Sequence, residues 1–213
     1  MGTLSRIVAA IFIALFAGLL AAGEHAAAVP DSLAANSLAW IGEYRIRDAR
    51  GERMMTIVRD ATRVEYRVQD MPVQVWRQVA DGVELQELHP QRGKMITYAP
   101  GDLRARNNEP DWGQIASLVD PDLRNGLNAG RSGKAFGETL QRYRGRDARN
   151  QSIELDWLTA SAMPARYRIV ATRADQTRAN ETIELRGIRR LPAEQAFTPI
   201  DGLRERGAAD LSD

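Results

Sequence analysis

Apolar and polar residues alternate along most of the chain beyond residue 37, which is the pattern of β-strands that bury one face. The clearest example lies within 63–69, where Val64, Tyr66 and Val68 alternate with charged or polar residues. The pattern predicts ten or eleven strands. Besides 63–69, they lie near 38–47, 53–59, 73–80, 83–89, 94–99, 136–144, 153–157, 166–171 and 182–187, with a short extended piece at 197–200.

The segments between these strands are short and rich in turn-forming residues. Glycine, proline and aspartate occur at 49–51, 70–72, 81–82 and 90–93. A parallel crossover needs a dozen or more residues, so strands joined this closely are expected to be antiparallel neighbours. We therefore predict a mainly β fold, in which one large antiparallel sheet curls into a half-open barrel with one face buried.

One insertion, at about 100–135, interrupts the alternation. Asp111 is a candidate helix N-cap, and Trp112, Ile115 and Val119 then recur at helical spacing. This stripe predicts one short amphipathic helix that ends before Pro121. The helix is expected to act as a lid on the sheet, with Trp112 as a lid residue.

Two segments are expected to lack regular structure. The end of the insertion, up to Lys134, is rich in glycine and is expected to be a mobile connection. The tail at 202–213 is rich in charge and alanine and is expected to be loosely ordered.

Residues 1–28 have the layout of a secretory signal peptide. Arg6 precedes an uncharged apolar run at 7–23, and small residues at 26 and 28 offer a cleavage site. Cleavage would leave one domain at 29–213, exported to the periplasm. The alternative is an uncleaved anchor in the inner membrane, because the apolar run approaches the length of a membrane-spanning helix. The chain has no cysteine, which excludes disulfides, a thiolate nucleophile and a lipid attached through a thioether.

The charge balance also limits the class of partner. The formal net charge is +1 at pH 7, whereas nucleic-acid binders concentrate positive charge on one face. We therefore expect no nucleic-acid partner. Only Lys94 and Lys134 of the 29 basic residues are lysines. Two interpretations of the arginine excess stay open: a surface that binds carboxylates or phosphates, or the codon bias of a GC-rich genome.

Three short stretches are similar to a known family. They are the hairpin region at 66–98 with its Asp81-Gly82 turn, the segment 157–169 with the motif 162–167 around Pro164, and the closing segment 191–202 with Phe197-Thr198-Pro199 and Asp201-Gly202. Together they resemble the outer-membrane lipoprotein carrier family, which is LolA-like, and the related amino-terminal domain of RseB. The resemblance implies a periplasmic half-barrel that binds a hydrophobic ligand.

Polar pairs on the strands offer little catalytic chemistry. Glu87 and His89 share one face of a strand and could supply two metal ligands or a base with its orienting group, but no third ligand is near in sequence. Glu154 and Asp156 could form a general acid and base, but their alternation with Ile153, Leu155 and Trp157 already explains them as a solvated polar face, which is the favoured interpretation. We therefore expect no enzyme activity, no metal and no cofactor.

The expected function depends on the aromatic residues. Most lie on the apolar side of their strands, where they either pack the core or line a cavity. The candidate ligand-binding residues are Trp40, Tyr44, Tyr66, Tyr98, Trp112, Ile115, Trp157 and Tyr167. We expect a periplasmic carrier for an acyl chain or a lipoprotein. The alternative is a regulatory or structural module that binds an envelope protein and encloses no ligand.

Overall fold

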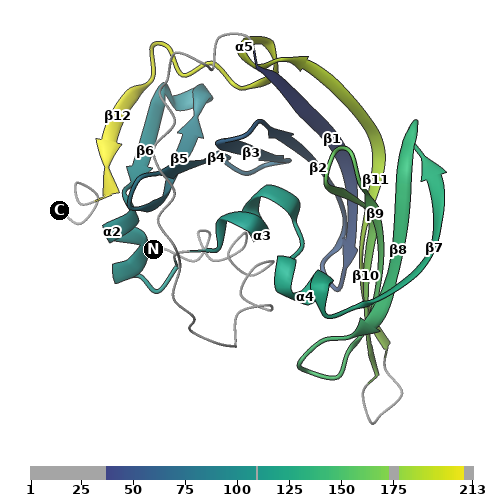
Figure 1. Cartoon of the computed structure of the whole chain (residues 1–213). Coiled ribbons are helices and arrows are strands. Elements are labelled where there is room, and N and C mark those ends of the chain that lie inside the picture. Colours follow the sequence, from purple (N-terminus) through teal and green to yellow (C-terminus); the bar gives the residue numbers. More distant parts are fainter. Residues whose placement is uncertain (1–36, 109, 173–177, 209–213) are drawn as a thin grey trace.

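A computed structural model describes residues 37–108, 110–172 and 178–208 of the protein (Figure 1). The predicted signal peptide and the end of the tail lie outside these residues. Within these ranges twelve strands form one sheet. They are β1 (Leu38–Asp48), β2 (Gly51–Arg59), β3 (Arg63–Val68), β4 (Val73–Val79), β5 (Gly82–His89), β6 (Lys94–Tyr98), β7 (Asn128–Ala135), β8 (Glu138–Arg146), β9 (Ser152–Leu158), β10 (Met163–Thr172), β11 (Arg178–Pro192) and β12 (Arg204–Gly207).

The sheet consists of two meanders that meet at β1. Strands β1 to β6 follow one another in space, as do β7 to β11, and β1 pairs antiparallel with both β2 and β11. Between the described strands only β12 and β6 pair in parallel. The prediction of one large, mainly antiparallel sheet is confirmed. The sheet is open, with β12 and β7 at its edges, and it curves around the insertion without curling strongly (Figure 1).

Three short helices lie in the insertion: α2 (Pro100–Ala105), α3 (Trp112–Ser117) and α4 (Pro121–Asn125). Helices α3 and α4 lie on the concave side of the sheet (Figure 1). The predicted helix is α3, but the expectation of a single helix is wrong. Pro100 and Pro121 are the first residues of α2 and α4, a helix position at which proline is common. Two separate short helices therefore flank α3, and neither is long enough to show an apolar stripe.

The glycine-rich end of the insertion is strand β7, so the expectation of a mobile connection is wrong. Strand β7 pairs with β8 through a two-residue turn at Phe136 and Gly137, both of which have positive φ. The predicted strand at 136–144 therefore begins later, at Glu138. Most of β7 is exposed, because it is an edge strand. Its residues need no apolar alternation, so the pattern gave no signal.

A segment near the C-terminus forms a strap across the outer, convex face of the sheet. This C-terminal strap (residues 193–207) begins with α5 (Ala193–Ala196) and ends with β12. Phe197 packs in a cluster with Ile41 and Val58, and Leu203 packs against Val75 and Leu88. Residues 197–200 are not a strand, and 204–207 are a strand rather than a loose tail, so both expectations are wrong. Contacts between distant segments order this part of the chain.

The strap is held by a buried carboxylate. Glu65 on β3 is fully buried and accepts hydrogen bonds from the Thr198 backbone N–H at 2.9 Å and its hydroxyl at 2.7 Å. Arg67 donates to the same carboxylate and also to the Ala196 carbonyl at 2.6 Å. A buried charge needs such partners because it has lost its water. Glu65 therefore fixes the strap to the middle of β3.

Removing this carboxylate tests the attachment. Glu65→Ala is expected to lower the free energy of unfolding by about 2–3 kcal/mol, because buried donors on Thr198 and Arg67 lose a charged acceptor. Urea unfolding followed by tryptophan fluorescence measures the change. The control is Glu194→Ala on the exposed side of α5, for which a change below about 0.5 kcal/mol is expected. Equal effects of the two variants would contradict the attachment.

Candidate functional site: the concave face and its lid

The structure brings all eight predicted binding residues into one cluster on the concave face. Six of them are between 0% and 7% exposed, whereas Trp40 and Trp112 are partly buried and pack against the others. The strand register groups the six residues that lie on strands, because inward positions on neighbouring strands come side by side. Helix α3 brings Trp112 and Ile115 to the same cluster. The six buried members are Tyr44, Tyr66, Tyr98, Ile115, Trp157 and Tyr167.

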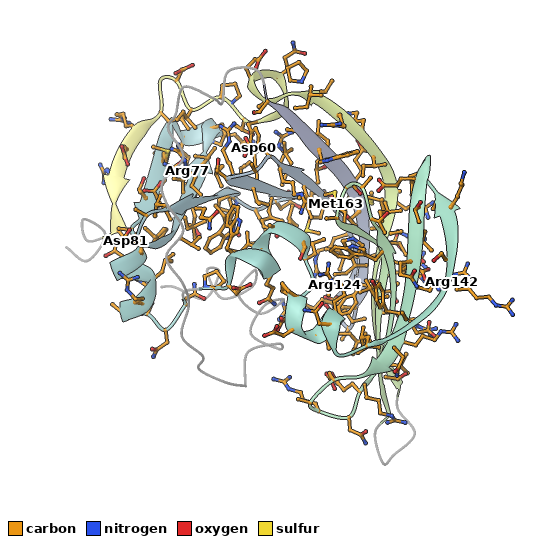
Figure 2. The ribbon with its side chains drawn as sticks, in the orientation of Figure 1. Asp60, Arg77, Asp81, Arg124, Arg142 and Met163 are labelled. Atoms are coloured by element: carbon orange, nitrogen blue, oxygen red, sulfur yellow. The ribbon has the colours of Figure 1, made fainter. Side chains whose placement is uncertain are left out.

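The insertion covers this cluster. Leu103 of α2, Ile115 of α3, and Val119 and Leu127 in the segments around α4 are all buried in it. Figure 2 shows side chains filling the space between the sheet and α3 and α4, with Arg124 projecting from α4. The Arg124 guanidinium stacks 4.7 Å from the centre of the Trp157 ring. A ligand could therefore reach the aromatic residues only after the insertion had moved.

Two side chains of the sheet hold α3 by its last turn. The Tyr66 hydroxyl donates a hydrogen bond to the Ile115 carbonyl, and the Arg59 guanidinium donates to the Ala116 carbonyl. Arg59 also donates to the carbonyl of Ser161, in the turn between β9 and β10. The last carbonyls of a helix lack partners within the helix, so they are natural acceptors. Arg59 thus joins α3 to two separate parts of the sheet.

Arg59 is a mostly buried cation whose acceptors are backbone carbonyls. None of the ion pairs between described residues includes Arg59. Burial lowers the pKa of its guanidinium, and the neighbouring Tyr44 and Tyr66 partly offset this effect. Carbonyl dipoles compensate a buried charge less fully than a carboxylate does. The contact is therefore easier to exchange than a buried ion pair.

Helix α3 has little stability of its own. It has six residues, which is far below the length at which an isolated helix persists. The Asp111 carboxylate caps its first turn by accepting from the Gln114 N–H at 3.0 Å, as predicted. Leu118 ends the helix in a left-handed conformation with φ of 63°. The position of α3 therefore depends on Ile115 and on the contacts from Arg59 and Tyr66.

Several polar atoms of the concave side are buried without a hydrogen-bond partner. They include the Tyr44 and Tyr167 hydroxyls, the Ser161 hydroxyl, the Trp76 indole Nε1 and the Gln74 Oε1. Burial raises the pKa of both tyrosines, so their hydroxyls stay protonated. Unpaired buried polar groups are costly and uncommon. These atoms offer hydrogen bonds to a molecule that enters the concave side.

Arg59 and Gln74 are not among the residues predicted from the sequence, although the alternation contains a signal for both. Met55, Ile57 and Arg59 occupy successive inward positions on β2, so Arg59 is a charge on an apolar face. Gln74 lies across from Tyr66 on β3, again among inward residues. A charged or amide side chain at an apolar position of a strand is the feature to search for.

Glu87 and His89 lie on β5, and the His89 Nε2 is buried without a hydrogen-bond partner. The Glu87 carboxylate accepts from the Tyr98 hydroxyl at 3.4 Å, and burial raises the pKa of this carboxyl despite that bond and a second one from Gln74. Burial, Lys94 and Arg92 all lower the pKa of His89. Among the described residues no group of three or more potential ligands could hold a metal ion.

Glu154 and Asp156 lie on the outer face and pair with arginines of β8 and β10. Asp156 is 3.2 Å from Arg166, and Glu154 is 3.8 Å from Arg168. The interpretation of this pair as part of a polar outer face is therefore correct. Separately, no helix in the described ranges has the length and apolar character required to cross a membrane.

The contact between Tyr66 and α3 can be tested by removing one hydroxyl. Tyr66→Phe is expected to lower the free energy of unfolding by about 1 kcal/mol and to speed amide hydrogen exchange in α3, because the Ile115 carbonyl loses a donor. Exchange followed by mass spectrometry measures the local effect. Tyr143→Phe, on β8, is the control and is expected to leave exchange in α3 unchanged. Unchanged exchange in both variants would contradict the role of Tyr66.

The raised pKa of Glu87 predicts a dependence of stability on pH. The pKa of Glu87 is higher in the folded protein than in the unfolded chain. The free energy of unfolding therefore falls as pH rises from the unfolded pKa to the folded pKa, because the unfolded chain ionises first. Glu87→Gln is expected to unfold at higher urea than the wild type at pH 7, and the difference should vanish below the ordinary pKa of glutamate. Urea unfolding across this pH range measures it. If the gain in urea midpoint of Glu87→Gln over the wild type grew toward low pH, the raised pKa of Glu87 would be contradicted.

No model of a known protein family matches the chain, and no curated protein sequence matches it. Solved structures do resemble it. An uncharacterised conserved protein from Thermus thermophilus is 13% identical with a TM-score of 0.45, and the match covers 79% of this chain and 90% of that one. A chain of the MucA/MucB complex from Pseudomonas aeruginosa is 10% identical with a TM-score of 0.44, covering 78% of this chain and 57% of that one.

A LolA superfamily protein from Nitrosomonas europaea is also similar. It is 9% identical with a TM-score of 0.29, and the match covers 77% of this chain and 91% of that one. The structural neighbours of the chain thus include LolA superfamily proteins and MucB, all at low sequence identity. The TM-scores of these three structures are below 0.5, so the similarities carry no conclusion about function.

Proposed function

We propose that the protein is a periplasmic carrier module that takes a hydrophobic ligand, such as an acyl chain, onto the concave face of its sheet. The observation that carries this proposal is the attachment of α3. A short helix covers an aromatic face and is held there by the side chains of Arg59 and Tyr66. A cover with so little stability of its own can leave the sheet and return to it.

Exchange of one apolar partner for another explains how such a carrier would load. With α3 displaced, Ile115 no longer covers the aromatic side chains, and an acyl chain replaces it there. Burial of apolar surface provides about 25 cal/mol per Å², so a ligand recovers the free energy that the helix contributed. The free Arg59 guanidinium then binds a carbonyl or carboxylate oxygen of the ligand in place of the Ala116 carbonyl.

Loading is expected to be visible with an apolar fluorescent probe. N-phenyl-1-naphthylamine should bind the full chain, and Trp112→Ala should weaken that binding about tenfold while the unfolding midpoint changes little, because Trp112 is a partly buried lid residue. Arg59→Met should speed probe association, since α3 loses one attachment. Phe136→Ala, in the exposed turn between β7 and β8, is the control and should behave like the wild type.

Native mass spectrometry of protein purified from the periplasm complements the probe. A co-purifying lipid is expected. If no lipid accompanies the protein and the probe does not bind, the carrier proposal is wrong. Recovery of the protein in the cytoplasm would contradict the periplasmic location, which rests on the sequence of residues 1–28.

The alternative function is an envelope interaction module that encloses no ligand. One observation favours it: six of the eight aromatic and apolar candidates are almost completely buried in the present arrangement, so the concave face is already packed. This module would keep α3 in place and bind an envelope protein through its surface. It predicts no probe binding in either the wild type or Arg59→Met, together with unchanged stability of α3 in the presence of lipid.

A further inference from the structure

The outer face of the sheet has a different character on its two halves. The C-terminal strap covers apolar residues on the β1–β6 side, whereas β8 to β11 and the second half of β1 present charged side chains. Antiparallel register aligns these side chains in two rows that run across the strands. One row contains Arg142, Asp156, Arg166, Glu184 and Arg45. The next contains Arg144, Glu154, Arg168, Thr182, Arg47 and Glu52.

The first row alternates in sign from strand to strand. Asp156 lies 3.8 Å from Arg142 and 3.2 Å from Arg166, and Glu184 lies 2.5 Å from Arg45. Arg142, labelled in Figure 2, belongs to the β8 end of this row. Each acid of this row therefore lies between two arginines, which is the favourable arrangement for charges directly across strands.

The second row has one break in this alternation. Arg168 lies 3.8 Å from Glu154, and Arg47 lies 2.5 Å from Glu52, so each arginine has an acid on the neighbouring strand that lies away from Thr182. Between the two arginines, where the pattern requires an acid, the residue is Thr182. Two guanidinium groups thus flank a neutral position on a solvent-exposed face.

A hollow of about 400 Å³ lies at this break. Its lining consists of Arg47, Arg166, Arg168, Thr182 and Glu184. Three arginines against one glutamate give the lining a formal charge of +2, and each of these arginines also pairs with an acid outside the lining. The side chains of Arg47 and Arg168 are 54% and 40% exposed and remain accessible to a binding partner.

We propose that this arginine hollow binds carboxylates of an acidic segment of a partner protein. Guanidinium groups bind carboxylates through paired N–H donors. Arg47 and Arg168 are two strand spacings apart, or about 10 Å, and alternate side chains of an extended peptide are about 7 Å apart, so flexible arginines on both sides can each engage a carboxylate. The hollow is larger than a single small anion needs. The hollow uses three arginines of the chain and does not depend on the carrier proposal.

The test fills the break in the row. Thr182→Glu places a carboxylate between Arg47 and Arg168, so it should raise the urea midpoint of unfolding and at the same time occupy the binding site. The probe is a fluorescein-labelled all-glutamate peptide, followed by anisotropy at low ionic strength, where screening is weak. The full chain should bind the peptide, and Thr182→Glu should weaken binding about tenfold.

Matched variants separate the site from overall charge. Thr139→Glu, at an exposed position on β8, changes the net charge equally and should keep wild-type affinity. Arg168→Gln should weaken binding without adding an acid. The proposal is overturned if the peptide does not bind, if Thr139→Glu and Thr182→Glu weaken it equally, or if inorganic phosphate or anionic lipid vesicles bind in preference to the peptide. None of these outcomes bears on uptake of the apolar probe.

Discussion

The apolar concave face of the open sheet has to be covered, and the rest of the structure depends on how this is done. The two meanders bring aromatic and aliphatic side chains from most strands onto one face, and burial of this face is the main source of stability. An open sheet cannot bury the face by closing on itself. The insertion provides the cover, but its helices are only five or six residues long. Their attachment to the sheet therefore decides both the stability and the accessibility of the aromatic cluster.

Arg59 connects this cover to the sheet at a cost in desolvation. A guanidinium that donates only to backbone carbonyls is less well compensated than one with a carboxylate partner, and it lies beside the unpaired Tyr44 hydroxyl. A fold selected only for stability would pair these groups or replace them by apolar ones. Their presence beneath α3 is consistent with a face that exchanges partners. Tyr66 adds a second contact to the same helix turn, so release of α3 requires both to break.

The two halves of the outer face are stabilised in different ways. Over β1 to β6 the C-terminal strap buries a second set of apolar residues and is fixed by Glu65. Over β8 to β11 there are charged rows instead, in which acids and arginines neutralise one another between strands. The rows stabilise the sheet without a second covering layer. At Thr182 the second row lacks an acid between two arginines. The hollow at this position is a polar surface distinct from the apolar site on the opposite face.

Alternation of apolar and polar residues was sufficient to predict the strands from β1 to β6 and from β8 to β11 and the inward aromatic set, and the short links predicted antiparallel pairing of consecutive strands. The pairing of β1 with β11, which joins the two meanders, was not predicted. Side-chain parity is a local property, so the sequence alone determines which residues share a face. Strands β7 and β12 escaped prediction because neither has a buried face of its own, and only pairing with β8 and β6 orders them. In the sequence, Arg59 is marked only as a charge at an inward position of a strand, and Thr182 is an ordinary strand residue. Only the tertiary structure placed Arg59 under α3 and Thr182 between two arginines, because contacts between segments distant in sequence depend on register and on the path of the chain.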